Sequence, residues 1–267
     1  MISFFPSRAV AIELFGLSIH WYGLMYLLAF LLAFVLLPRL QRFRGLSLTK
    51  DDWASLLSWG IIGVIVGGRL GFVIFYEPTH FAEYPLEIFQ IWHGGMSSHG
   101  GFLGVAIAFA YACKKKGIDP LLLADLLVVP IAIGLALGRI GNFINEELYG
   151  VVTTMSWAIN VTGVEGLRHP TQLYAVAKDL LIAGVCLWHL RMVKPVIVGR
   201  TFALFLILYS VLRYIVEYFR VQEYGLLHFG LITMSRGQLL TVPLLIVGVI
   251  LWWQLGRNAS SQVPQEE

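Results

Sequence analysis

Four arginines stand inside or at the ends of long apolar runs of this 267-residue sequence: Arg69, Arg139, Arg213 and Arg220. An arginine in the middle of a membrane costs at least about 2.5 kcal/mol, so such arginines usually line a wet cavity or meet a partner. The guanidinium group offers two parallel hydrogen bonds to a phosphate and keeps its charge at any relevant pH. The four arginines therefore indicate a site for an anionic lipid or a phosphate ester.

One predicted helix carries a clear polar stripe. Tyr209, Arg213, Glu217 and Arg220 follow one another at i, i+4, i+8 and i+11, which places them within one quadrant of a helix. Glu217 can then pair with both arginines and offset part of the cost of burying them. The stripe has two interpretations, a structural ion-pair ladder or a binding site, and for Arg213 we favour the second.

A second polar cluster begins at Arg139. Two amides, a carboxylate and a glycine follow it closely: Asn142, Asn145, Glu147 and Gly150. Glycine lets another backbone or a lipid headgroup approach closely. The alternative is a helix C-terminus with Asn145 and Gly150 as turn residues. So many polar groups in so short a stretch favour a headgroup pocket.

A histidine lies in a glycine-rich segment at the start of another predicted helix. His99, Gly100 and Gly101 leave the imidazole ring open to approach, beside backbone N–H groups that favour an anion. His99 can act as a base, as a hydrogen-bond donor or as a passive interfacial group. Ser97 and Ser98 also suggest an intramembrane serine protease, but such a dyad needs its histidine on a different helix.

The composition determines which elements position these residues. The chain is 58% hydrophobic and 13% charged, against roughly 45–50% and about 25% in soluble domains. Since about 20 apolar residues cross a bilayer as a helix, we predict an all-α integral membrane protein with seven transmembrane helices and small elements in the outer loops. We expect the first span to be retained and not cleaved as a signal peptide. The predicted spans cover residues 19–37, 53–76, 97–113, 121–141, 172–190, 201–220 and 238–256.

Charge patterning orients these spans. One set of loops and ends carries eleven basic residues and the other three, so the positive-inside rule predicts a periplasmic N-terminus and a cytoplasmic C-terminus. We expect one catalytic domain over residues 1–257 and a polar, disordered cytoplasmic tail over residues 258–267. This orientation brings Tyr22, Arg69, His99, Arg139, Arg213 and Arg220 to the outer ends of their helices.

Several function classes are excluded or disfavoured. The basic residues are scattered, so a nucleic acid is not an expected partner. Cys113 and Cys186 stand alone, which predicts neither a disulfide scaffold nor a zinc site. The last span has no lysine for a Schiff base, which excludes a retinal protein. The inner halves of the helices are nearly all apolar, which disfavours a channel or transporter.

Several motifs together resemble a known family, the bacterial prolipoprotein diacylglyceryl transferases. The most specific is Gly-Arg-x-Gly-Asn-Phe-Ile-Asn-x-Glu, which begins at Gly138. The others are His99-Gly-Gly-Phe-Leu-Gly, Arg168-His169-Pro170 with Gln172 and Tyr174, Arg213-x-x-x-Glu217-x-x-Arg220, and Met234-Ser235-x-Gly237-Gln238.

The resemblance implies transfer of the diacylglyceryl group of phosphatidylglycerol to the lipobox cysteine thiol of a preprolipoprotein. The reaction forms a thioether, releases glycerol phosphate and requires no metal or cofactor. The expected protein is a multi-pass monomer of the bacterial inner membrane whose site faces the outer leaflet and the periplasm. Two alternatives stay open: a non-catalytic anionic-lipid-binding or scramblase-like protein, and an intramembrane protease.

The resemblance also assigns roles to residues. Arg139 and Arg213 would hold the phosphate, and His99 is the candidate base, although it could equally position the lipid glycerol by hydrogen bonding. The remaining candidates for substrate binding are Tyr22, Arg69, Gly100, Gly101, Asn142, Asn145, Glu147, Gly150, Tyr209, Glu217 and Arg220.

Overall fold

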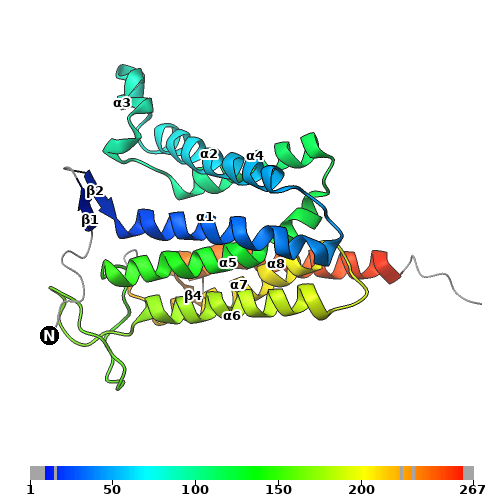
Figure 1. Cartoon of the computed structure of the whole chain (residues 1–267). Helices are drawn as coiled ribbons and strands as arrows, with labels where there is room; N and C mark the ends of the chain where they lie inside the picture. Colours follow the sequence, from blue (N-terminus) through cyan, green and yellow to red (C-terminus); the bar gives the residue numbers. More distant parts are fainter. Residues whose placement is uncertain (1–9, 15–16, 223–224, 230–231, 261–267) are drawn as a thin grey trace, which may run out of the picture. The chain divides into compact units, whose positions relative to one another are not determined.

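A computed structural model (Figure 1) describes residues 10–14, 17–222, 225–229 and 232–260 of the chain. The chain divides into two compact units. The first combines Met1–Arg44 with Ala124–Glu267, and the second is Gly45–Leu123. The prediction of one catalytic domain over residues 1–257 stays a prediction.

Each predicted span corresponds to a long helix in the described part of the chain, with ends that differ by a few residues. The last helix continues through Asn258 to Ser260, so the predicted tail begins as helix, and residues 261–267 lie outside the described residues. The long helices are α1 (Trp21–Leu40), α2 (Lys50–Phe75), α4 (Ser98–Lys116), α5 (Pro120–Ile144), α6 (Thr171–Met192), α7 (Arg200–Glu217) and α8 (Arg236–Ser260).

Short elements occupy the connections. Two antiparallel pairs of strands, β1 with β2 and β3 with β4, are small β additions to the predicted all-α fold. The short elements are β1 (Val10–Leu14), β2 (Leu17–His20), η1 (Gln41–Arg44), α3 (Pro78–Glu83), η2 (Pro85–Phe89), η3 (Ile91–His93), β3 (Leu227–Phe229) and β4 (Ile232–Met234).

The chain is a mostly helical membrane protein. Within the described residues, α1, α2, α5, α6 and α8 are long and apolar enough to cross a membrane. The helices α4 and α7, which match the other two predicted spans, are more polar: α4 ends in three lysines, and α7 contains Arg213 and Glu217. The count of seven spans and the orientation of the termini therefore stay predictions.

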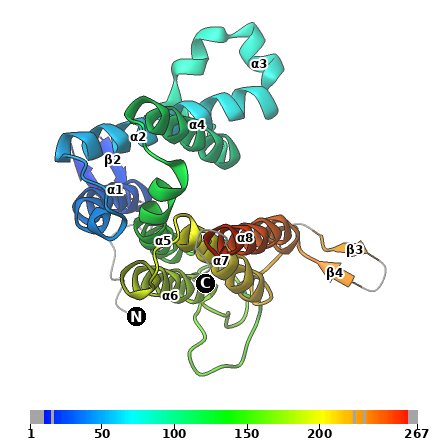
Figure 2. The same cartoon turned by 90° about the vertical axis from the view of Figure 1, so that its right-hand side faces the viewer.

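In the first unit the long helices run alongside one another (Figures 1 and 2). Helix α7 packs against both α6 and α8. Helix α1 approaches α5 closely, since a Cβ placed at Gly134 would lie 3.3 Å from the Cβ of Ala29. Buried apolar side chains such as Leu126, Ile182 and Ala203 fill the space between α5, α6 and α7.

A buried polar network, the Arg44–Asp125 network, ties η1, α5, α6 and the start of α7 together. The Arg44 Nε donates to Asp125 Oδ2 (2.8 Å), and its Nη2 donates to Thr201 Oγ1 (2.6 Å). Asp125 also accepts from the backbone N–H groups of Gly199 (3.0 Å) and Phe202 (2.8 Å), and so caps α7 from a neighbouring helix. Every charge in this network has its partners.

In the second unit α2 and α4 pack with their backbones in contact. A Cβ at Gly67 would overlap the carbonyl oxygen of Gly100, and a Cβ at Gly104 would overlap the carbonyl oxygen of Gly63. Glycines spaced by four residues permit this approach between membrane helices. The side chain of Ser97 caps the start of α4 by accepting from the backbone N–H of Gly100 (3.3 Å).

Candidate functional site

A chain of hydrogen bonds links the end of α5 to the start of α1. Arg139 Nη1 donates to Asn142 Oδ1 (3.1 Å), and Asn142 Nδ2 donates in turn to the hydroxyl of Tyr22. The Tyr22 hydroxyl donates to Glu147 Oε2 (3.0 Å), and Asn145 Nδ2 donates to Glu147 Oε1 (3.2 Å). The structure therefore brings these five predicted site residues together.

The backbone that presents Glu147 is unusual. Its neighbours Glu146 and Leu148 both have φ of 57°, in the left-handed region that non-glycine residues rarely adopt. Two residues at the start of α6 hold this segment: Thr171 Oγ1 donates to the carbonyl of Leu148 and Gln172 Nε2 to that of Glu147, each over 2.7 Å. Strained backbone held by its surroundings is typical of functional sites.

On α7 the carboxylate of Glu217 holds two arginines. Glu217 Oε2 lies 3.0 Å from Arg213 Nη2 and 3.9 Å from Arg220 Nη1. The carboxylate is buried against the N-terminus of α8, where Ser235 Oγ donates to Oε1 (3.5 Å). A Cβ at Gly237 would overlap this carboxylate, so α8 approaches it as closely as a glycine allows. Glu217 therefore fixes the positions of the guanidinium groups of Arg213 and Arg220.

Arg220 lies beyond the helix that was predicted to carry it. Helix α7 ends at Glu217, and the chain then turns so that Arg220 pairs in a β-bridge with Gly150. Gly150 fits tightly here, since a Cβ would come within 2.6 Å of both His169 and Phe219 atoms. The glycine thus joins the polar segment after α5 to the end of α7.

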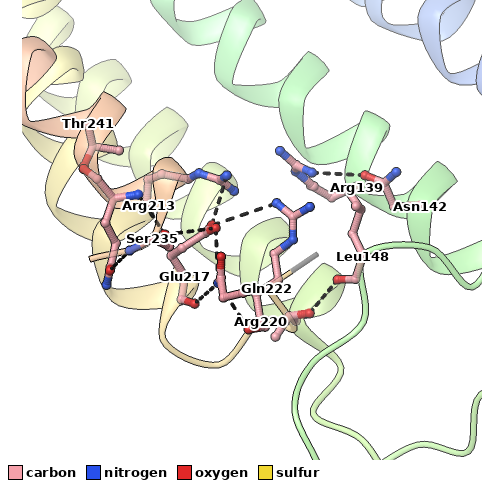
Figure 3. A network of polar contacts seen from close by, with 11 residues as sticks. Arg139, Asn142, Leu148, Arg213, Glu217, Arg220, Gln222, Ser235 and Thr241 are labelled. Atoms are coloured by element: carbon pink, nitrogen blue, oxygen red, sulfur yellow. Dashed lines mark hydrogen bonds and ion pairs between the residues drawn. The ribbon is translucent and has the colours of Figure 1, made fainter. Parts of the chain in front are cut away.

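The two polar clusters face one another. Figure 3 shows the guanidinium groups of Arg139, Arg213 and Arg220 pointing toward the same space, although they come from different segments. In the part of the chain that the structure describes, these three guanidinium groups accompany two carboxylates, those of Glu147 and Glu217. Arg213 and Arg220 keep 16% and 20% of their side-chain surface exposed, so the cluster can be reached. Such an arrangement suits a singly charged phosphodiester.

Three predicted site residues lie in the second unit. His99 is exposed in the first turn of α4. Gly100 is part of the α2–α4 contact, which accounts for the need for glycine there, whereas a Cβ at Gly101 would meet only ordinary contacts with Val64. Ser97, a residue of the alternative protease interpretation, serves as the α4 cap. The proposed part of His99 in the chemistry stays a prediction.

Arg69 is held by backbone carbonyls. All five of its N–H groups are used: Nε donates to Ile88 (2.9 Å), Nη1 to Gly94 (2.6 Å) and Gly95 (3.1 Å), and Nη2 to Glu87 (2.5 Å) and Gln90 (3.3 Å). The guanidinium group also lies 5.0 Å from the centre of the Phe81 ring. This geometry indicates that Arg69 orders the segment 87–95, and its predicted contact with substrate stays a prediction.

Tyr209 was predicted as a site residue, but its surroundings and several supporting residues of the site were not. The Tyr209 ring stacks on Phe205 and lies 4.5 Å from the Nζ of Lys178, which pairs with Asp179. Three supporting residues were not predicted as such: Thr171 and Ser235, described above, and Gln222, whose Nε2 donates to the backbone carbonyl of Glu217 (3.2 Å). For Ser235 the signal was present, since serine three residues before Gln238 is a capping-box pattern, and both of its hydrogen bonds form.

Metal ligands do not gather in the described residues. No group of three or more His, Cys, Asp or Glu side chains there is placed to hold an ion, and Cys113 and Cys186 are buried and free. Fold and geometry together define a helical membrane protein in which arginines, amides and a tyrosine lie close together.

Comparison with known proteins identifies the family. Residues 9–254 match the family described as prolipoprotein diacylglyceryl transferase. A phosphatidylglycerol–prolipoprotein diacylglyceryl transferase from Methylibium petroleiphilum is 46% identical over 94% of this chain and 97% of its own length. Proteins of the same name from Polynucleobacter asymbioticus (43%; 94% and 95% covered) and Bordetella avium (40%; 98% and 100% covered) are also similar. The chain belongs to the prolipoprotein diacylglyceryl transferase family, and the resemblance inferred from its motifs is confirmed.

Proposed function

We propose that the chain transfers the diacylglyceryl group of phosphatidylglycerol to the lipobox cysteine thiol of a preprolipoprotein. Membership of the family and the name shared by its relatives support this activity. The single observation in the structure that supports it is the convergence of the guanidinium groups of Arg139, Arg213 and Arg220.

The arginines act on the leaving group. The cysteine sulfur forms a bond to the glyceryl carbon, and the electron pair of the breaking C–O bond leaves with the phosphate of glycerol phosphate. The thiol proton passes to a base. Guanidinium groups held in place before the reaction stabilise the charge that develops on the leaving oxygen, and such preorganised donors contribute most of the rate enhancement in many enzymes. Arg139 and Arg213 fill this role, and Glu217 fixes Arg213.

The Tyr22–Asn142–Glu147 chain shapes the pocket for the headgroup glycerol. Asn142 links Arg139 to Tyr22, so the phosphate site and the hydroxyl site share one support. Within the described residues the buried Oδ1 of Asn145 has no hydrogen-bond donor, which leaves an acceptor for a glycerol hydroxyl. Gly150 keeps this pocket joined to Arg220.

His99 is the proposed base. A thiol with a pKa of about 8.5 is mostly protonated at pH 7, so removal of its proton assists attack. His99 is exposed at a helix start, where a ring nitrogen can be reached by substrate. A role in positioning the lipid glycerol by hydrogen bonding is the alternative for this residue.

The proposed topology places this chemistry at the outer leaflet. Seven spans, a periplasmic N-terminus and a cytoplasmic C-terminus would bring the ends of α5 and α7 and the starts of α1 and α6 to the periplasmic side of the inner membrane. The excess of basic residues on the opposite loops supports this orientation. We propose a monomer that takes its lipid from the bilayer and the signal peptide from the periplasmic side.

The test incubates purified protein with phosphatidylglycerol and a lipobox peptide and follows the peptide by mass spectrometry. We expect a diacylglyceryl mass addition on the cysteine, and none when serine replaces it or when phosphatidylglycerol is omitted. Lipid binding without consumption would instead indicate a scramblase-like protein. A cleaved peptide in the absence of phosphatidylglycerol would indicate a protease, and either result would overturn the proposal.

A further inference from the structure

A second buried ion pair lies beside the arginine cluster and takes no part in the chemistry of transfer. Lys178 and Asp179 are neighbours on α6, with only 6% and 1% of their side-chain surfaces exposed, and the Nζ of Lys178 contacts Asp179 Oδ1. Consecutive residues on a helix point in different directions, so helical spacing does not by itself make this contact. The lysine side chain must bend back to reach its neighbour.

The surroundings of the pair connect it to the proposed phosphate site. Lys178 Nζ lies 4.5 Å from the centre of the Tyr209 ring, and Tyr209 precedes Arg213 by one helical turn on α7. The positive charges of Arg139 and Arg213 act on both Lys178 and Asp179. The carboxylate of Asp179 is therefore within electrostatic reach of the same two arginines that would hold the phosphate.

The charge balance shows what the lysine contributes. With Lys178 present, Asp179 has its counter-charge on its own helix and does not draw on Arg139 or Arg213. Without the lysine ammonium, the counter-charges that act on the buried Asp179 carboxylate would include Arg139 and Arg213. An uncompensated buried carboxylate is costly, so Asp179 would either take up a proton or be stabilised by Arg139 and Arg213. A carboxylate stabilised by these arginines would compete with the phosphate.

We propose that Lys178 is a positioning residue that neutralises Asp179 and thereby keeps Arg139 and Arg213 available for the phosphate group. The inference rests on the proposed function, since it assumes that these arginines bind phosphate. Lys178 itself does not contact the substrate in this proposal. A purely structural pair would stabilise the helix bundle but would not specifically control the affinity for phosphatidylglycerol.

Charge-removing variants test this role. Lys178→Met keeps the length of the side chain, and we expect it to lower kcat/KM for phosphatidylglycerol by about 100-fold, the size of effect seen when an electrostatic donor is lost. We expect the double variant Lys178→Met/Asp179→Asn, which removes the competing carboxylate as well, to recover to within about threefold of the wild type, as coupled neighbours do. Lys178→Arg, which keeps the charge, should stay active.

Controls separate this effect from folding and from the peptide site. Lys116→Met removes the lysine of another ion pair, with Asp52 of α2, and should leave kcat/KM unchanged. Thermal unfolding in detergent reports whether each variant is folded. The KM for the lipobox peptide should stay constant while the KM for phosphatidylglycerol rises.

The outcomes distinguish the inference from the proposed function. Recovery in the double variant supports the inference. If Lys178→Met is as active as the wild type, or if the folded double variant is as impaired as the single one, the inference is overturned. If one of these two results is found while Arg139→Ala and Arg213→Ala are inactive, the role of Lys178 is wrong but the proposed function still holds. If the arginine variants keep full activity, the phosphate site itself is wrong.

Discussion

An arginine paired with a carboxylate lies at each end of α7, and the two pairs differ in charge balance and exposure. At the N-terminal end Arg44 has 2% and Asp125 0% of its side-chain surface exposed, and hydrogen bonds from Arg44 also reach Thr201 and two backbone carbonyls. At the C-terminal end one carboxylate, that of Glu217, serves two partly exposed arginines, and a third guanidinium group points toward them.

The two ends show how structural arginines differ from those that we propose bind a ligand. A guanidinium group whose nitrogens all donate to protein acceptors holds the structure together, as in the Arg44–Asp125 network. Arg69, with five backbone acceptors, belongs to the same class. An excess of guanidinium groups over carboxylates, within reach of the surface, leaves charge for a ligand. Burial in an apolar run alone does not distinguish the two classes.

The largest expected effect is a loss of stability when the Arg44–Asp125 network, at the N-terminal end of α7, is broken. Arg44→Met leaves the buried Asp125 uncompensated, and breaking a buried pair in this way costs about 3–5 kcal/mol. We expect a strong fall in the thermal unfolding temperature and in the yield of folded protein, measured in detergent. The matched variant Arg213→Met should unfold close to the wild-type temperature, because its site is partly exposed. Equal destabilisation by both variants would remove the distinction between the two ends.

A second prediction concerns the connection between the polar clusters. Gly150→Ala places a methyl group against His169 and Phe219 and displaces the strand that pairs with Arg220. We expect transfer activity to fall by about 100-fold, since small displacements of a positioning segment have effects of this size. Gly184→Ala on α6, where a Cβ would meet nothing within 4 Å, is the matched control and should keep its activity. Full activity of Gly150→Ala would contradict the proposed link.

The smallest expected effect is that of Arg69→Lys. A lysine offers three donors where five carbonyls now accept, so the segment 87–95 should loosen. We expect faster limited proteolysis within this segment and an unchanged KM for phosphatidylglycerol. A rise in the KM for phosphatidylglycerol with no change in proteolysis would instead indicate that Arg69 binds the phosphate.

The helices could be predicted from the sequence because run length and composition determine them directly. Every predicted span has its helix, and ends such as Trp21 and Met192 lie within a few residues of the predicted ones. The meeting of Arg139 and Arg213 could also be predicted, because both were expected at the same end of the bundle and a buried charge requires a partner. The structure agrees with that expectation.

Other features depend on contacts that spacing does not reveal. The acceptors of Arg69 are backbone carbonyls of a loop, and no sequence pattern marks them. Arg220 was placed on a helix that ends three residues earlier, because the bridge to Gly150 competes with a further helical turn. For Gly100 a signal did exist, since the spacing of Gly63, Gly67 and Gly71 is typical of close helix packing.

The proposed role of the converging arginines is to stabilise a phosphate leaving group. Its most direct test is kcat/KM for phosphatidylglycerol in folded, membrane-inserted Arg139→Ala and Arg213→Ala, measured as diacylglyceryl transfer to a lipobox peptide. We expect a loss of about 10²–10³-fold in each variant, the usual effect of removing one preorganised donor. Substantial activity in both variants would contradict it.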